Sequence, residues 1–246
     1  MKKAFHLILW AILVALIGTS CRPLYRASIP NQPMITERGQ AEVDIGVETG
    51  SGYLNASYSL SDHLFVTAGG NAYSSNHTTA QFAELGAGYY SFNKERRFGT
   101  SVMGQIGFGY AEVIRDESVS NFFEPGDIEL IEYDVQFLRF GVTPSAYWKS
   151  DHVDVALGMR NSMLYWLSPS EFQDQEVDGI DIFVEPVVSV QTGSAVTKFF
   201  LESSLQIPIY RSFSHPVSPI HLGFGISFLI SKSALTGYTQ GKALEQ

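Results

Sequence analysis

The sequence predicts an all-β protein, a transmembrane antiparallel up-and-down β-barrel of about ten strands that follows a signal peptide and a Pro-rich leader. Three observations predict this fold. Apolar and polar residues alternate with a period of two in ten successive segments. The connections between these segments alternate between short and long, which is typical of outer-membrane barrels. Only 17% of the 246 residues are charged, well below the roughly 25% of a soluble domain.

The composition excludes several classes of protein. Aromatic residues make up 13% of the chain, which argues against disorder, and a single Cys cannot form an intramolecular disulfide. The formal net charge of −9 argues against a nucleic-acid partner, which requires a basic surface. The chain has no Cys/His metal cluster, phosphate loop or Gly-x-Ser-x-Gly elbow, and Asp127 with Glu129 is too small an acidic set for calcium. We therefore expect neither a cofactor nor a metal.

Residues 1–20 have the features of a signal peptide. Lys2 and Lys3 precede an apolar stretch that is shorter than a membrane-spanning helix, and small residues follow it at 18–20. Cys21, the only cysteine, comes next. This arrangement resembles a bacterial lipoprotein signal, although Gly18 replaces the usual Leu. The resemblance implies export by the general secretory route and lipid attachment at Cys21, and an ordinary signal peptide or a single anchor helix is the alternative.

Residues 21–40 contain three prolines and show no clean periodicity, so we expect a Pro-rich periplasmic leader. The leader resembles that of a family of lipobox-bearing outer-membrane β-barrel proteins from Bacteroidota. The residues that carry the resemblance are Cys21, Pro23, Tyr25, Ile29-Pro30-Asn31, Pro33-Met34 and Glu37-Arg38-Gly39-Gln40. It covers about 20 residues and implies an outer-membrane barrel downstream.

The barrel is expected over residues 41–231. Each segment places apolar residues on one face and Gly, Ser, Asn, Gln or acidic residues on the other, as in Val43, Ile45 and Val47 against Glu42, Asp44 and Glu48. The ten segments are 41–48, 52–60, 64–72, 83–89, 101–110, 130–148, 153–160, 180–191, 198–207 and 220–228. In 130–148 the apolar residues change from odd-numbered to even-numbered positions, and a β-bulge near 137–139 would restore a single apolar face. Pro144 and Pro186 indicate further local irregularity.

The connections predict the orientation. Those near 60–62, 93–97, 149–151 and 192–195 are short, whereas those at 115–128, 168–178 and 209–218 are long. Short turns face the periplasm in outer-membrane barrels, so both ends of the barrel chain are expected there, and a lipid on Cys21 would lie in the inner leaflet. The last strand resembles a C-terminal barrel-assembly signal, with Phe224, Ile226 and Phe228 alternating, but the chain continues as a periplasmic tail at 232–246.

The apolar face is expected to point outward. It carries almost no charge, whereas the outer face of a soluble barrel would be rich in Lys and Glu. Aromatic residues on this face fall at two levels, as expected for rings at the headgroups of a bilayer. The periplasmic level holds Tyr58, Tyr89, Trp148, Phe199 and Phe228, and the outer level holds Tyr110, Tyr133 and Tyr165.

The polar face then lines the lumen. It carries a charge network predicted to comprise Glu84, Asp134, Arg139, Asp154, Arg160, Asp181, Glu185, Lys198 and Glu202, together with Glu42, Asp44 and Glu48. A narrow barrel is filled by side chains, and charges inside it must be paired or hydrated. The sequence thus predicts an outer-membrane envelope protein with a largely plugged, acid-rich lumen, either structural or a narrow channel for small solutes. Its expected partners are outer-membrane lipid and the barrel-assembly machinery.

A barrel hydrolase of the protease or lipase type, with its site at the extracellular rim, is the alternative. Surface enzymes of this kind place His with Asp or Ser at the outer strand ends. The candidates are His77, Asp174, Asp178, Ser212, Ser214 and His215. Their spacing matches no motif, so we expect no enzymatic activity.

Overall fold

The alternating segments form an antiparallel sheet that closes on itself. In the computed structural model the described residues are 32–48, 50–74, 78–93, 95, 97–118, 128–167, 171–172, 175–176, 179–212 and 219–231, without the side chains of 113–118, 128–133, 171–172 and 175–176. The strands are β1 (Ala41–Glu48), β2 (Ser51–Ser59), β3 (Leu64–Ser74), β4 (Thr78–Phe92), β5 (Phe98–Ser118), β6 (Ile128–Lys149), β7 (Val153–Trp166), β8 (Glu171–Phe172), β9 (Gln175–Glu176), β10 (Gly179–Gly193), β11 (Thr197–Leu205), β12 (Ile207–Tyr210) and β13 (Ile220–Ile230).

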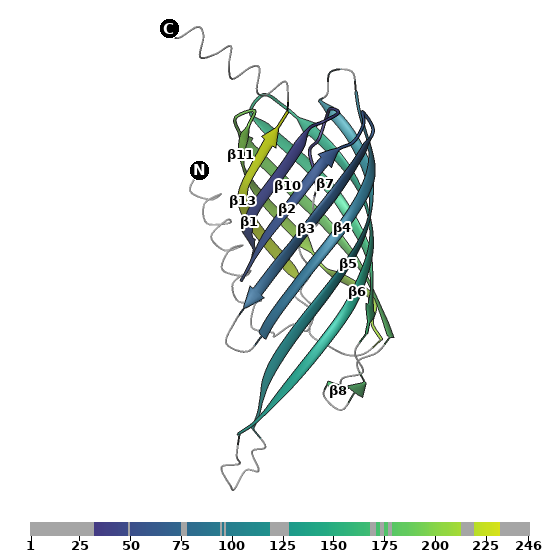
Figure 1. Cartoon of the computed structure of the whole chain (residues 1–246), viewed down its shortest axis with the longest axis vertical. Coiled ribbons are helices and arrows are strands. Elements are labelled where there is room, and N and C mark those ends of the chain that lie inside the picture. Colours follow the sequence, from purple (N-terminus) through teal and green to yellow (C-terminus); the bar gives the residue numbers. More distant parts are fainter. Residues whose placement is uncertain are drawn as a thin grey trace, which may run out of the picture.

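Each strand pairs with its neighbours in sequence, and the first strand pairs with the last. β1 is antiparallel to both β2 and β13, over eight residue pairs with β13 from Ala41↔Ile230 to Glu48↔Gly223. β11 and β12 both pair with β10 and are two parts of one strand interrupted at Gln206. The eleven strands of the main sheet therefore form a closed barrel of ten, as predicted (Figure 1). β8 and β9 form a separate small hairpin.

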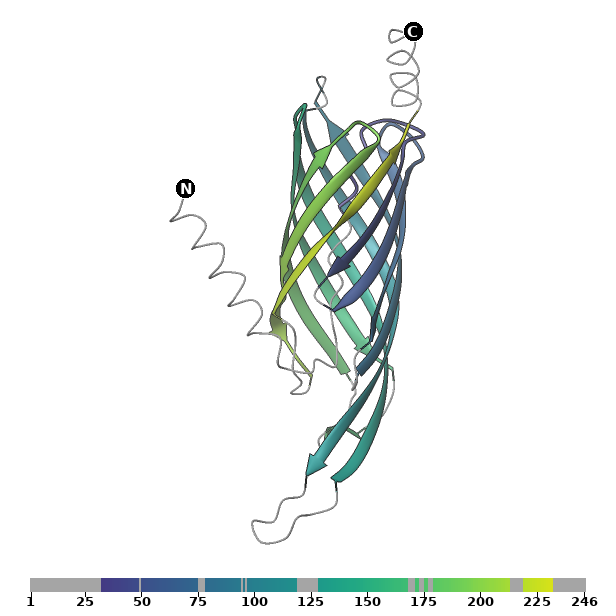
Figure 2. The same ribbon diagram turned by 90° about the vertical axis from the view of Figure 1, so that its left-hand side faces the viewer.

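The two ends of the barrel differ. The short-turn end carries the connections at 60–63, 93–97, 150–152 and 194–196, together with the start of β1 and the end of β13. At the opposite end, β5 and β6 remain paired as far as Ser118↔Ile128, so the two ends of the loop expected at 115–128 belong to an extended hairpin, while 119–127 lie outside the described residues. This hairpin projects beyond the other strands (Figure 2). No helix among the described residues has the length and apolar character needed to cross a membrane.

The outer wall of the barrel is apolar and the inner wall is polar. Asp134 is the only charged strand residue in the exposed class among those whose side chains are described. The same wall exposes large apolar side chains, among them Ile45, Leu54, Leu85, Ile106, Val142, Leu157, Leu201 and Phe224. Such a surface would aggregate in water, whereas the hydrocarbon of a bilayer solvates it. The fold is therefore that of a transmembrane barrel.

The predicted bulge in β6 is wrong. The β5–β6 register runs without a shift from Phe98↔Trp148 to Ser118↔Ile128. Val135 and Phe137 are instead buried inside the barrel, while Gln136 is exposed outside. The polarity of the two faces inverts because β5 and β6 continue past the apolar belt, where the outer face is polar and the inner face packs against neighbouring strands.

The two strand prolines lie where the hydrogen-bonded ladder is interrupted. The β6–β7 register omits Thr143 and Pro144, and the β10 ladder with β11 and β12 omits Glu185 and Pro186. Proline has no N–H to donate, so a gap at these positions is expected. The second gap lies opposite Gln206, whose backbone N–H bonds to Pro219 instead.

Candidate functional site

The most informative feature of the lumen is a stretch of chain that is not a strand. Residues 32–40, here called the plug segment, precede β1 at the short-turn end, where 32–35 are buried inside the barrel and Arg38 and Gly39 are exposed at the rim. Met34 is 1% exposed and Ile35 is 2% exposed, which is the burial of core residues. The leader expected over 21–40 thus includes a part that is buried inside the barrel. Residues 1–31, including Cys21 and the expected signal peptide, lie outside the described residues, as does the tail at 232–246.

Two apolar clusters hold the plug segment. Ile35 packs with Phe65, Tyr90 and Met103 on one side of the lumen. Met34 packs with Tyr147 and Ala156 on the other side, and Phe92 contacts both clusters. Burial of a Met or Ile side chain stabilises a fold by roughly 1.5–3 kcal/mol. These contacts bridge strands β3 to β7 from within.

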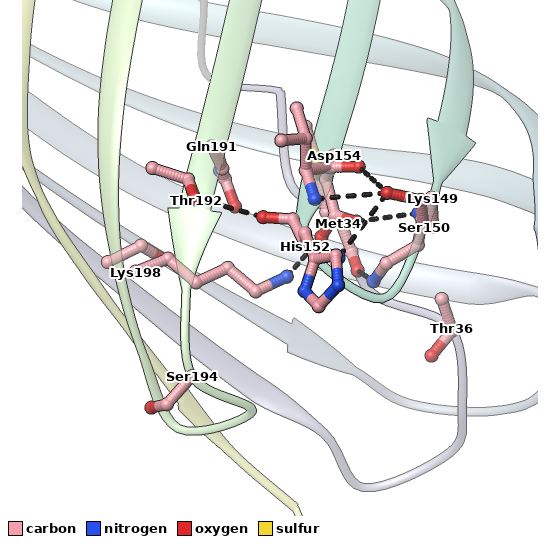
Figure 3. A network of polar contacts seen from close by, with 12 residues as sticks. Met34, Thr36, Lys149, Ser150, His152, Asp154, Gln191, Thr192, Ser194 and Lys198 are labelled. Atoms are coloured by element: carbon pink, nitrogen blue, oxygen red, sulfur yellow. Dashed lines mark hydrogen bonds and ion pairs between the residues drawn. The ribbon is translucent and has the colours of Figure 1, made fainter.

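Polar contacts fix the backbone of the plug segment. The N–H of Met34 donates to Oε2 of Glu42 at 2.7 Å, and Nζ of Lys149 donates to the carbonyl oxygen of Met34 at 2.9 Å. Figure 3 shows Met34 beside Lys149 and Asp154, where Asp154 also pairs with Lys198. A buried backbone group without a partner is costly, so these bonds offset the burial of the Met34 peptide.

A tight turn joins the plug segment to β1 at the rim. Gly39 has a φ of 75°, which non-glycine residues rarely adopt. Its N–H donates to the carbonyl of Ser59 at 3.0 Å, while the side chain of Gln40 accepts from the N–H of Thr36 at 2.6 Å. The turn therefore directs the preceding residues back into the lumen.

Two buried ion pairs lie deeper in the lumen, on the side of strands β4, β6, β7 and β10. Nη2 of Arg139 donates to Glu84 at 2.6 Å, and its guanidinium lies 3.9 Å from the centroid of the Phe82 ring. Arg160 pairs with Glu185 through Nε at 3.1 Å and through Nη2. Ser162 donates to the other oxygen of Glu185 at 2.5 Å. Arg139 and Glu84 join β6 to β4, which lie on either side of β5 in the sheet. Arg160 and Glu185 join β7 to β10, which are paired directly. Both ion pairs therefore tie the wall together.

The side formed by β11, β13, β1 and β2 is acidic. Glu42, Asp44, Glu48 and Glu202 lie on its inner face, and strands β13, β1, β2 and β3 contain no Lys or Arg. Neutral groups supply several of the contacts: Ser227 donates to Glu42 at 3.2 Å and Tyr53 donates to Glu202 at 3.0 Å. This side of the lumen therefore groups four carboxyl side chains on strands whose neighbours β13, β2 and β3 bring no Lys or Arg.

An aromatic stack lines the inner wall of β4, β6 and β7 towards the long-loop end. Phe82 stacks on Phe137, and Phe137 meets Trp166 edge-on with ring centroids 5.6 Å apart. The rings fit because Gly107 and Gly109 lie beneath them, and a Cβ at either position would collide with a ring. Nε1 of Trp166 donates to Asp181 at 3.1 Å, which places this predicted lumen acid at the outer end.

The sequence predicts Asp134 in the lumen charge network, and this prediction is wrong. Its side chain is exposed on the outer wall, where Oδ1 accepts a 2.6 Å hydrogen bond from the hydroxyl of Tyr110. The cause is the unshifted register of β6, which turns Val135 rather than Asp134 inward. Asp134 and Tyr110 thus mark the level at which the apolar belt ends.

Replacement of Asp134 by Asn is therefore expected to change the free energy of unfolding by less than about 0.5 kcal/mol, as for ordinary surface positions. Tyr110→Phe, which removes the other partner of the same bond, is the matched control and is expected to behave alike. Urea titrations of the refolded barrel in lipid vesicles measure both. A loss of several kcal/mol in Asp134→Asn would return this residue to the interior network.

The exposed aromatic residues lie at defined levels. Tyr58, Tyr89, Trp148 and Phe228 each pair with the first residue of a neighbouring strand, so all four lie at the short-turn end, and Phe199 is exposed near them. Tyr165 is exposed and Tyr110 is half-buried towards the other end. The side chain of Tyr133 is outside the described residues. Contact of these rings with lipid headgroups stays a prediction.

The candidate residues for hydrolysis do not assemble into a described site. Ser212 donates to Oδ1 of Asp181 through both its N–H, at 2.8 Å, and its hydroxyl, at 3.1 Å. His77, Asp174, Asp178, Ser214 and His215 lie outside the described residues. Within the described part of the chain, no group of three or more His, Cys, Asp or Glu could hold a metal ion.

Sequence reasoning missed the plug segment. Its residues lack periodicity and contain Pro33, which predicts a linker. The available signal was Met34-Ile35, an apolar pair directly before a polar turn and a strand whose first inward residue, Glu42, can accept a backbone N–H. Few exposed linkers would carry such a pair.

No family model and no curated protein matches the chain. Among solved structures, an outer-membrane channel from Pseudomonas putida F1 is similar with a TM-score of 0.43 and 9% identity, covering 82% of this chain and 100% of that one. The translocator domain of the autotransporter NalP from Neisseria meningitidis gives a TM-score of 0.43 and 11% identity, covering 77% and 86%. The N-terminal barrel domain of OprF from Pseudomonas aeruginosa gives 0.35 and 9%, covering 78% and 98%.

Proposed function

We propose that this chain is an outer-membrane envelope protein whose barrel encloses a narrow, acid-lined path. In this proposal the plug segment closes the path at the short-turn end. Small cations pass when the segment is displaced. The single observation that carries the proposal is the burial of Met34 and Ile35 within the lumen. A segment that blocks a polar lumen can control the passage of ions if that lumen conducts once the segment is displaced.

The outer wall supports the location. An exposed apolar belt free of charge matches the lipid-facing surface of outer-membrane barrels. The short turns at the end that carries the start of β1 and the end of β13 support a periplasmic position for that end. The alternation in β13 favours recognition by the barrel-assembly machinery, and the signal peptide predicted at 1–20 supplies the route of export.

The charge distribution supports cations as the passing ions. On the β4–β10 side, Glu84 and Glu185 are matched by Arg139 and Arg160, so these two acids add little net charge. On the opposite side Asp44 and Glu202 lie on strands β1 and β11, where the neighbouring strands β13 and β2 bring no cationic partner. Carboxylates along one wall of a narrow polar path attract cations and repel anions at short range.

Displacing the plug segment tests the proposal. In the double variant Met34→Asp/Ile35→Asp, two carboxylates would enter apolar clusters, and burial of an unpaired charge is strongly unfavourable. The segment is therefore expected to leave the lumen. Planar-bilayer recordings are expected to show no conductance steps for the wild type and small cation-preferring steps for the variant, read from the reversal potential in asymmetric KCl.

A matched control keeps the plug segment in place. Met34→Leu/Ile35→Leu preserves volume and apolarity, so it is expected to stay closed. In the displaced background, Asp44→Asn/Glu202→Gln is expected to reduce the preference for cations. If the displaced variant is folded, as judged by its heat-modifiable migration in gels, and yet never conducts at any voltage, the channel is refuted and a structural envelope role is left.

A further inference from the structure

A small polar cavity opens at the short-turn end, beside the plug segment. It measures about 200 Å³ and lies between the turns at 150–152 and 194–196, whose exposed residues form its mouth. Asp154, Gln191 and Lys198, from the ends of β7, β10 and β11, form its inner wall (Figure 3). The volume is below the roughly 300–1,000 Å³ of sites for drug-sized ligands. The cavity therefore suits a small polar molecule that enters from outside the barrel.

Gln191 presents a hydrogen-bond acceptor to this cavity. The residue is 3% exposed, and its Nε2 donates to Oε1 of Glu42 at 3.5 Å. An ionised carboxylate only accepts hydrogen bonds, so the amide nitrogen must be the atom that faces Glu42. The amide oxygen of Gln191 then points away from Glu42, and no donor among the described residues reaches it. Because a buried acceptor without a donor is costly, this oxygen indicates a ligand that donates a hydrogen bond.

Lys198 presents the opposite polarity. Its ammonium group pairs with Asp154, and its side chain is 15% exposed. An ammonium group carries three N–H donors, so donors are left beyond the one that Asp154 accepts. Lys149 lies opposite Asp154 in the β6–β7 ladder, so two lysines flank a single carboxylate at this end of the cavity. The excess of positive charge indicates an anionic group on the ligand.

A simple ion satisfies only one of these two groups. Lys198 would repel a cation that has no anionic group, and an anion that has no donor would leave the amide oxygen of Gln191 unsatisfied. Lys198 lies opposite Gly193, two residues after Gln191, so Lys198 and Gln191 are diagonal neighbours on the same face of adjacent strands. Diagonal neighbours are roughly 7–8 Å apart. A short molecule with a cationic and an anionic end can therefore contact both.

We propose that this cavity binds a small α-amino acid in its zwitterionic form. The ammonium group of the ligand donates to Oε1 of Gln191, and its carboxylate accepts from Nζ of Lys198. The inference goes beyond the proposed channel and is independent of it, because binding at the rim requires no conductance.

Calorimetric titration of the full chain, refolded in detergent micelles, tests the proposal with alanine as the probe. Three compounds of similar size serve for comparison: ethylammonium lacks the carboxylate, propionate lacks the ammonium group, and glycerol carries only hydroxyls. Alanine is expected to bind saturably, at one site per chain. It is expected to bind at least about tenfold more tightly than each of the other three, since each of them loses a charge-assisted hydrogen bond.

Two variants connect the binding to the cavity. Gln191→Met removes the acceptor and Lys198→Met removes the donor, so each is expected to weaken the binding of alanine at least about tenfold. The matched control is Asp62→Asn, in the turn between β2 and β3 on the same rim but outside the cavity lining, and it is expected to bind alanine as the wild type does. Heat-modifiable migration in gels shows whether each variant is folded.

The proposal is overturned if alanine does not bind the folded wild type, or if propionate, ethylammonium or glycerol binds as tightly as alanine. It is also overturned if either folded cavity variant binds alanine as tightly as the wild type, because the site then lies elsewhere. The comparison of the four compounds uses the wild type alone, so it decides the proposal even where a variant does not fold. No readout involves conductance, so failure of the channel leaves this result untouched.

Discussion

Replacement of Arg160 by Met is expected to lower the free energy of unfolding by about 3–5 kcal/mol. Arg160 is 0% exposed and its partner Glu185 is 1% exposed. Two nitrogens of the guanidinium contact the same carboxylate, which also accepts from Ser162. Without Arg160, the carboxylate of Glu185 would stay buried in the wall of β7 and β10. The hydroxyl of Ser162 would be the donor that it keeps there. Urea titrations in lipid vesicles, followed by tryptophan fluorescence, measure the loss.

Two further variants test the cause. Arg160→Met/Glu185→Met removes both charges, so its cost is expected to be well below that of Arg160→Met alone. Lys198→Met breaks the pair with Asp154 at the rim, where the Lys198 side chain is 15% exposed and Asp154 keeps the N–H of Ser150 as a donor at 3.2 Å, so it is expected to cost less than Arg160→Met. If Arg160→Met costs no more than Lys198→Met, the interior pair is hydrated and does not stabilise the wall.

Replacement of Leu85 by Lys is expected to destabilise the barrel in a bilayer by about 2–4 kcal/mol, the usual cost of a cation facing lipid near the midplane. Leu85 is 63% exposed on β4, in the middle of the apolar belt. The exposed side chain faces hydrocarbon, so a charge there loses its hydration. Equilibrium unfolding in vesicles of defined lipid gives the difference.

Gln81→Lys is the matched control because Gln81 lies on the same strand and the same face. It pairs with Tyr110, at the level where Asp134 ends the belt. A lysine there reaches the headgroups and is expected to cost no more than about 1 kcal/mol. Equal costs at Leu85 and Gln81 would mean that hydrocarbon does not cover this wall, which would contradict a membrane-spanning barrel.

The strands could be predicted from the sequence because a lipid-facing wall and a polar lumen impose a period of two on every strand. Residues such as Ile45, Leu85 and Leu157 show that period without interruption, so strand number and direction follow. The exception was β6. A strand that leaves the membrane inverts its polarity, and the sequence pattern of this inversion is identical to that of a one-residue bulge. Asp134 was misplaced for this reason.

The partners within the lumen could not be predicted in the same way. Alternation shows that Glu84 and Arg139 share a face, but the 2.6 Å contact between them depends on the stagger of strands β4 and β6, which are not adjacent in the sheet. The plug segment lay beyond such reasoning as well. The apolar pair Met34-Ile35 indicates burial, but the place of its burial depends on the space that ten strands enclose.

The seam between β1 and β13 has a consequence for biogenesis. The ring cannot close before the last strand has been synthesised, since its eight residue pairs with β1 are the final ones to form. The plug segment is tethered directly to that seam strand, so it is carried along when the seam closes. Met34 and Ile35 are buried among strands β3 to β7, so closure of the ring and burial of this pair would be one event.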